Sequence, residues 1–317
     1  MNPYAGILSA LVAAVLFGVS TPLAKLELSS AHPLIVAGLL YLGSGAGLAI
    51  WRMVLAVSGN TRGETPLSRT DLPWLAGAIL AGGVVAPALL LLGLMTTFAS
   101  AASLLLNLEA VATAVIAWLV FRENVDKRVG AGFACILLGG ILLSLPQDGG
   151  IAISSGALLI AAACLFWGID NNLTRKISAS DPSQIAMCKG LVAGVVNLGL
   201  ALAIGARLPA ASVTLSVATI GFFGYGISLV LFVQALRHLG AARTGAYFST
   251  APFAGAALAF ALGQGRFDWA FCAAGALMFA GVWLHVTERH EHRHIHEPIE
   301  HEHLHFHDEH HPPPLSV

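Results

Sequence analysis

The chain has 317 residues, of which 56% are hydrophobic and only 10% are charged, and its mean hydropathy is +0.78. Soluble domains carry about 25% charged residues, so this composition excludes a soluble globule, and it equally excludes a coiled coil and a disordered protein. The net charge of −1, with no basic patch outside short loops, excludes a nucleic-acid binder. The composition predicts an all-α integral membrane protein.

Ten apolar stretches are each long enough to cross a bilayer, which takes about 20 residues per helix. In chain order they are 5–24, 33–55, 72–94, 98–120, 129–145, 153–174, 183–204, 213–236, 241–263 and 268–286. If the N-terminus is cytoplasmic, twelve Lys and Arg residues lie in inward-facing segments and three, Lys25, Arg207 and Arg266, lie outside. The positive-inside rule therefore predicts a multi-pass protein of the cell (inner) membrane with both termini in the cytoplasm.

The two halves of the chain resemble each other. The segment 11–25 (LVAAVLFGVSTPLAK) aligns with IAAACLFWGIDNNLTR, which ends at Arg175, and 94–111 aligns with 236–253. Each half, 1–146 and 147–287, contains five predicted spans, and because five is odd the second half enters the membrane from the opposite side. The sequence therefore predicts ten transmembrane helices in a five-plus-five inverted repeat, an arrangement that transporters use for alternating access.

Three segments carry a resemblance to a known family: the start ALVAAVLFGVSTPLAK, the run ASAASLLLNLEAVATAVIAWLVFREN (99–124) and its counterpart GAARTGAYFSTAPFAGAALAFALGQ (240–264). Over residues 5–286 the chain resembles the EamA-type branch of the drug/metabolite transporter superfamily. Within the family pattern, Ala110 stands where a proline is usual and Arg122 where a glycine is usual, whereas Glu123 and Pro252 are kept. The resemblance implies a fold and an export function, and it does not imply a substrate.

Three ionisable side chains lie well inside predicted spans, where they are costly unless they face the bundle interior: Glu109, Asp170 and Lys189. Asp170 and Lys189 lie at similar depths, about 7–9 Å from the inner surface, so they could pair across adjacent helices. Alternatively, Lys189 snorkels to the interface and Asp170 is hydrated locally. We expect Glu109 to face the cavity and Asn107 to face a neighbouring helix, because the two side chains point to different sides of one helix.

Burial favours the protonated form of a carboxyl group, so Glu109 is a candidate for proton-coupled transport, with a neutral structural glutamate as the alternative. Other polar and aromatic groups in apolar runs suit a cavity for a small organic molecule. The predicted pathway residues are Glu109, Asp170, Lys189, Asn172, Trp167, Tyr225 and Gln234.

The C-terminal segment 288–317 changes composition abruptly and holds ten of the thirteen histidines of the chain. They are His290, His292, His294, His296, His301, His303, His305, His307, His310 and His311. Imidazoles that alternate along an extended chain and are interleaved with carboxylates suit Zn²⁺, Ni²⁺, Co²⁺ or Cu²⁺. The segment is predicted to be a cytoplasmic tail, disordered without metal. Its two H-E-x-x-H strings arise from the alternation and do not indicate a protease.

The sequence therefore predicts a secondary transporter, not an enzyme, that exports a small organic metabolite or drug and needs no cofactor. Two alternatives remain: a divalent-metal exporter (Ni, Co or Zn), and a membrane-anchored metal sensor or buffer. The expected partners are a small-molecule substrate, the lipid bilayer and divalent metal ions at the tail, with no nucleic acid; a homodimer is compatible with the sequence.

Overall fold

The computed structural model describes residues 3–59, 65–121, 127–145, 154–177, 179–239, 244 and 247–287. Within these residues the secondary structure is helical, without a strand, as the composition predicts. The helices are α1 (Pro3–Glu27), α2 (Pro33–Val57), the 3₁₀ turn η1 (Arg69–Asp71), α3 (Leu72–Ala78), the π-helix η2 (Ile79–Val85), α4 (Ala86–Leu94), α5 (Ala99–Leu105), α6 (Leu108–Phe121), α7 (Lys127–Ser144), α8 (Ser155–Lys176), α9 (Pro182–Ala203), α10 (Ala211–Gly221), the π-helix η3 (Phe222–Ile227), α11 (Ser228–Leu239), α13 (Ala251–Ala261) and α14 (Trp269–Val286).

Seven helical segments of the described chain are long and apolar enough to cross a membrane, and three shorter apolar helices cover 128–144, 251–261 and 269–284. These segments fall on the ten predicted stretches. Large apolar side chains point outward from several helices, among them Ile50, Val57 and Val195. An apolar outer surface on a bundle of apolar helices is stable in lipid and not in water. The protein is therefore a helical, multi-pass membrane protein.

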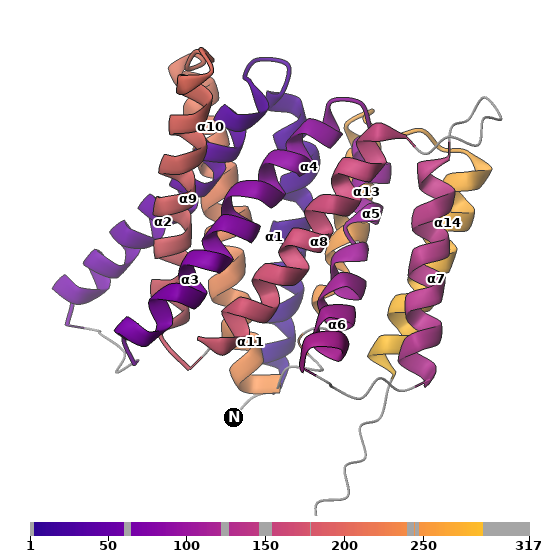
Figure 1. Cartoon of the computed structure of the whole chain (residues 1–317), viewed down its shortest axis with the longest axis horizontal. Coiled ribbons are helices and arrows are strands. Elements are labelled where there is room, and N and C mark those ends of the chain that lie inside the picture. The colour runs from indigo at the N-terminus through magenta and orange to yellow at the C-terminus, as the bar shows by residue number, and fades with distance from the viewer. Residues whose placement is uncertain are drawn as a thin grey trace, which may run out of the picture.

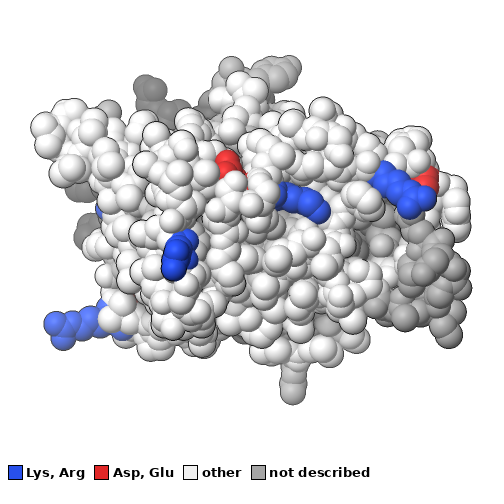
Figure 2. Space-filling view, turned by 90° about the horizontal axis from the view of Figure 1, so that it is seen from above, with Lys and Arg blue, Asp and Glu red and all other residues white. Residues whose placement is uncertain are grey.

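Charged side chains are sparse at the end of the molecule where α4 ends and α10 begins (Figure 2). Figure 1 places the N-terminus at the opposite end. By chain order, the end shown in Figure 2 contains Lys25, Arg207 and Arg266, the three basic residues that the sequence assigns to the outward side.

Two of the long helices begin at a proline that follows a capping side chain. Pro33 opens α2 after His32, whose Nδ1 accepts a hydrogen bond from the Leu34 N–H at 3.3 Å. Pro182 opens α9 after Asp181, whose carboxylate accepts the next free backbone N–H groups. Proline suits the first helical turn because its missing N–H has no partner there in any case.

Glycines allow α2 and α9 to pack with their backbones almost in contact. A Cβ atom placed on Gly190 would lie 2.5 Å from the Gly45 nitrogen, and one placed on Gly194 would lie 2.6 Å from the Leu42 nitrogen. The G-x-x-x-G motif at Gly190/Gly194 therefore mediates close packing, as expected for such motifs in membranes. This contact joins the first half of the chain to the second.

Several of the described spans contain a local departure from the α-helix. The predicted span 72–94 contains η2, and the predicted span 213–236 contains η3. The predicted span 98–120 is divided into α5 and α6 by a turn at Leu106–Asn107, where Asn107 Nδ2 donates to the Leu104 carbonyl at 2.9 Å. Asn107 also contacts Met278 Sδ of α14 at 3.8 Å, so it faces a neighbouring helix, as predicted.

The helices pack in a pattern that crosses between the halves. Helix α1 packs against α11 and α13, α8 packs against α4 and α6, and α7 packs against α14. Figure 1 shows α7 and α14 side by side at one end of the molecule.

Candidate functional site

The clearest polar site in the bundle is an ion pair between α8 and α9. Lys189 Nζ lies 2.6 Å from Asp170 Oδ1 and 2.7 Å from Oδ2. Thr174 Oγ1 also donates to Asp170 Oδ1 at 2.9 Å, and Lys189 donates to Thr174 at 3.3 Å. The side chain of Asp170 is 7% exposed and that of Lys189 is 15% exposed. The predicted pairing is therefore confirmed, and Lys189 does not snorkel away from Asp170.

The ion pair lies directly against the backbone of η2. A Cβ atom on Gly82 would lie 1.9 Å from Asp170 Oδ2, so only a glycine leaves room for the carboxylate here. The Gly82–Gly83 pair thus lets a charged side chain of α8 reach the middle of the third span.

Side chains from three helices bind the carbonyl groups of η2. Tyr41 Oη donates to the Gly82 carbonyl at 2.6 Å, and Trp167 Nε1 donates to the same oxygen at 3.0 Å. Asn197 Nδ2 donates to the Gly83 carbonyl at 2.8 Å. A π-helix departs from the i→i−4 ladder, so carbonyl groups near it need partners from outside the helix. Of these donors, sequence reasoning missed Asn197; a lone asparagine within the apolar run of α9 was the available signal.

A second polar group joins α8 to α6. Asn171 Nδ2 donates to Glu109 Oε1 at 2.9 Å and to Thr113 Oγ1 at 3.1 Å. The neighbouring Asn172 is buried and donates to the Thr113 carbonyl at 3.0 Å and to the Gly168 carbonyl at 2.8 Å. Glu109 is half-buried, and its bound partner is a neutral amide. Three consecutive residues of α8 therefore connect three other elements: α9, η2 and α6.

Aromatic rings continue the site toward α1 and α11. The ring of Tyr225 lies 5.4 Å from that of Tyr41 and 5.7 Å from that of Phe17. Phe17 in turn lies 5.5 Å from Phe248, which lies 4.8 Å from Phe232. The rings form a continuous apolar column beside the η2 carbonyl group that Tyr41 binds.

The structure thus brings together six of the seven predicted pathway residues through direct contacts or shared partners: Asp170, Lys189, Glu109, Asn172, Trp167 and Tyr225. Gln234 is also half-buried, but it lies on α11 about 13 Å along the helix from Tyr225, so we do not include it in the site.

A polar cluster closes the end of the bundle nearest the ion pair. Arg52 at the end of α2 donates to the carboxylate of Asp181 and to the hydroxyl of Ser183. The Asp181 N–H donates to the Thr65 carbonyl at 2.7 Å. Ser180 Oγ donates to Asp71 Oδ2 at 2.9 Å. We call Arg52, Thr65, Asp71, Ser180, Asp181 and Ser183 the end cluster.

The charge of Asp181 is stabilised within the end cluster. Burial opposes its ionisation, but the hydrogen bonds from Arg52 and Ser183 outweigh this effect and hold the pKa of the carboxyl group below its ordinary value. Asp181 is therefore an anion at neutral pH, available to bind Arg52.

No group of three or more His, Cys, Asp or Glu side chains that could hold a metal ion occurs in the described part of the chain. The ten predicted histidine ligands of the tail, His290 to His311, lie outside the described residues. Metal binding by the tail therefore stays a prediction.

A helical membrane bundle with charged side chains buried in its interior is typical of integral membrane transport proteins, and comparison with known proteins gives the family. The EamA-like transporter family matches residues 4–145 and 154–287, so the chain belongs to this family. A protein of Methanothermobacter thermautotrophicus named as an uncharacterized transporter is 30% identical over 293 residues, which cover 88% of this chain and 85% of that protein.

Further comparisons agree with this assignment. The uncharacterized transporter YyaM of Bacillus subtilis is 24% identical over 189 residues, covering 56% of this chain and 61% of that protein. A solved crystal structure with 18% sequence identity has the same fold, with a TM-score of 0.64 over 90% of this chain and 98% of the other.

Proposed function

We propose that this membrane transporter is a secondary exporter of a small organic metabolite or drug that works by alternating access. In this proposal ten helices cross the cell (inner) membrane as two inverted five-helix repeats, 1–146 and 147–287, with both termini in the cytoplasm. The substrate pathway runs between the repeats, past Asp170, Lys189 and Glu109.

The observation that carries the proposal is that corresponding spans of the two halves depart from the α-helix at matching positions. The third span contains η2 and the eighth contains η3. The turn between α5 and α6 has its counterpart in the turn that precedes α13 at Ser249–Thr250. Ile79 and Phe222, which begin the two π-helices, are as far apart in the chain as Leu106 and Ser249, which begin the two turns. Interrupted helices at matching positions of two repeats are typical of transporter binding sites.

Helix packing supports the same symmetry. If α1 corresponds to α8, then the contacts of α1 with α11 and α13 correspond to those of α8 with α4 and α6, and all four contacts are present. If α2 corresponds to α9 and α7 to α14, exchanging the two halves leaves the α2–α9 contact and the α7–α14 contact in place. A two-fold axis between the halves produces this pattern, and the proposal places that axis in the membrane plane.

The buried charges support a role for Glu109 in coupling. Asp170 and Lys189 neutralise each other at 2.6 Å, so the pair adds no net charge to the interior. Glu109 is half-buried, is bound by the neutral amide of the exposed Asn171, and changes the net charge of this site whenever it gains or loses a proton. Exchange of a proton on Glu109 against the cargo is the proposed coupling step.

The end cluster supports alternating access because it joins the two proposed repeats at one end. Arg52 and Thr65 belong to the first half, and Asp181 and Ser183 belong to the second. In the proposal these bonds close the cytoplasmic entrance and break when the pathway opens inward.

The test is metabolite profiling of the medium of cells that express the full chain, compared with cells that express none. We expect a small organic solute to accumulate in the medium with the full chain and to accumulate less with Glu109→Gln. Glu27→Gln is the matched control, because Glu27 lies at the end of α1 and binds Ser216 of α10. No solute difference between expressing and non-expressing cells would contradict the proposal.

A chain that ends at residue 287 extends the test to the histidine tail. Unchanged solute export with this shortened chain supports the tail as an accessory. If only metal tolerance responds to the protein, and only when the tail is present, the divalent-metal alternatives replace the proposal.

A further inference from the structure

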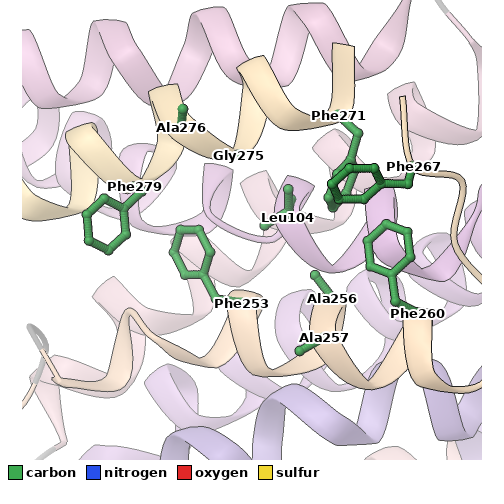
Figure 3. Close-up of a pocket in the computed structure, with 10 residues that line it drawn as sticks. All are labelled: Leu104, Phe253, Ala256, Ala257, Phe260, Phe267, Phe271, Gly275, Ala276 and Phe279. Atoms are coloured by element: carbon green, nitrogen blue, oxygen red, sulfur yellow. The ribbon is translucent and has the colours of Figure 1, made fainter. Parts of the chain in front are cut away.

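An apolar groove separates α13 from α14, and it opens on the outer surface of the bundle. Its volume is about 440 Å³. Phenylalanine rings occupy both ends of the groove, small residues of the two helices form its middle, and Leu104 of α5 forms its floor (Figure 3). The lining residues are Leu104, Phe253, Ala256, Ala257, Phe260, Phe267, Phe271, Gly275, Ala276 and Phe279.

The groove is about as long as the hydrocarbon region of one leaflet of a bilayer is thick. It extends from Phe267, just before α14, to Phe279, ten residues beyond the first residue of that helix. At 1.5 Å per residue this helical part is about 15 Å long. Half of a hydrocarbon core is also about 15 Å. If Phe267 lies at the level of the headgroups, the groove spans the tail region of a single leaflet, where its surroundings are acyl chains and not water.

Side chains at the shallow end of the groove are those expected at a membrane interface. Phe267 and Trp269 are each 76% exposed, and tryptophan is enriched at the level of the lipid headgroups. Between them and α13 lies Arg266, whose side chain is 61% exposed and whose Nε is 3.9 Å from Asp268 Oδ2. A contact of that length leaves the guanidinium accessible to a phosphate oxygen, which arginine binds well.

We propose that one acyl chain of an anionic phospholipid occupies the groove between α13 and α14, with its phosphate group bound by Arg266. The apolar lining accounts for the chain, and the length of one leaflet accounts for its orientation. The exposed guanidinium of Arg266, which contacts Asp268 only at 3.9 Å, accounts for the headgroup. The occupant is a lipid of the leaflet in which the α13–α14 loop lies.

The lipid would lie next to the fourth span, whose helix is interrupted by the turn between α5 and α6. Leu104, the floor of the groove, lies two residues before the turn at Leu106–Asn107, and Asn107 contacts Met278 of α14. An acyl chain in the groove keeps α14 apart from α13 and holds it against α7, with which it packs.

The test uses the full chain in nanodiscs that contain phosphatidylglycerol with a photoreactive diazirine on its acyl chain. After illumination, mass spectrometry locates the modified peptides. We expect the label to concentrate on 253–279, and Ala257→Phe together with Ala276→Phe, which fill the groove, to remove that label. Ala280→Phe is the control, since Ala280 is exposed on α14 and does not line the groove.

The headgroup is tested by competition with unlabelled lipids. Phosphatidylglycerol should compete better than phosphatidylcholine or a free fatty acid, and Arg266→Gln should reduce this preference about fivefold, as expected for one basic side chain at an anionic surface. Arg207 is exposed at the same end of the molecule, so Arg207→Gln is the control and should leave the preference for phosphatidylglycerol unchanged.

Three results would overturn the proposal. The first is label spread evenly over the lipid-facing helices, and the second is crosslinks that join two copies of the chain through the groove. The third is competition by the fatty acid that equals competition by phosphatidylglycerol and does not change with Arg266→Gln. Each is read from modified peptides and does not depend on transport, so the result is independent of the proposed export function.

Discussion

Asp170 and Lys189, 19 residues apart in the chain, face each other across the α8–α9 contact with both carboxylate oxygens within 2.7 Å of the ammonium nitrogen. Both side chains are largely removed from solvent. Replacing one member of such a pair lowers the free energy of unfolding strongly, because the charge that remains has no partner. Replacing both members costs far less.

Lys189→Met should therefore lower the free energy of unfolding by about 3–5 kcal/mol, because it leaves the Asp170 carboxylate without its ammonium. The double variant Asp170→Asn with Lys189→Met should recover most of this loss. Thermal unfolding of the purified protein in detergent measures both. If the double variant is no more stable than Lys189→Met alone, the two side chains do not act as a pair.

Gly82→Ala should destabilise the protein by about 1–3 kcal/mol, the usual cost of overpacking. The new methyl group would lie 1.9 Å from Asp170 Oδ2 and would push the carboxylate away from Lys189. Gly199→Ala is a matched control, because Gly199 lies on α9 and a Cβ atom there meets nothing within 4 Å. Equal unfolding temperatures for the two variants would argue against a close contact between η2 and Asp170.

The end cluster should respond to acid through Asp181. Its pKa is lower in the folded protein than in the unfolded chain, so its contribution to stability is complete above the ordinary carboxyl pKa of about 3.9 and is lost as the pH falls through the lowered value. Unfolding temperatures measured from neutral to acidic pH should show this loss. Asp181→Asn should remove the part of the acid dependence that comes from this group.

Arg52→Gln provides a second check of the same contact. It removes the donor that favours the ionised carboxyl, so the pKa of Asp181 in the folded protein should rise toward its unfolded value. The acid-induced loss of stability that comes from this group should therefore be smaller than in the unmodified protein. An acid profile identical to that of the unmodified protein would mean that Arg52 does not stabilise the Asp181 anion.

Glu109 should govern the response of transport to pH if it carries the coupling proton. With Glu109→Gln, the export of the solute identified by metabolite profiling should fall, and whatever export remains should not vary with external pH. Asn171→Leu keeps the carboxyl group and removes the amide bound to it, so it should shift the pH profile and not abolish it. A pH profile that survives Glu109→Gln unchanged would assign the coupling to another group.

The sequence predicts the helical membrane class and most span positions, because a membrane-spanning helix requires a run of about 20 apolar residues and such runs are visible in the sequence. It also gives the pairing of Asp170 with Lys189 as one of two alternatives, since two opposite charges at one depth of adjacent helices can pair or the lysine can reach the interface alone. The π-helices were not predicted, because the hydropathy of 72–94 is the same whether the helix has an extra residue in one turn or not. The Gly82–Gly83 pair is the feature of the sequence that marks η2. The role of Gly82 is seen only in the structure, where Asp170 occupies the space that a side chain would need.

The end cluster could not be predicted for a different reason. Arg52, Thr65 and Asp181 lie in polar segments at helix ends, where ordinary solvated side chains are expected. Their contact depends on the placement of α2 beside α9, which is set by glycine packing far from the charges themselves.

The wide turn at η2 also has a geometric consequence. One residue of an ordinary helix advances the chain by about 100° and 1.5 Å. If the extra residue of η2 were absorbed, α4 would swivel by about that angle around its own axis, and the Gly82 oxygen would turn away from Tyr41 and Trp167. Those two donors, together with Asn197 at the Gly83 carbonyl, therefore hold the third span in one rotational position about its axis.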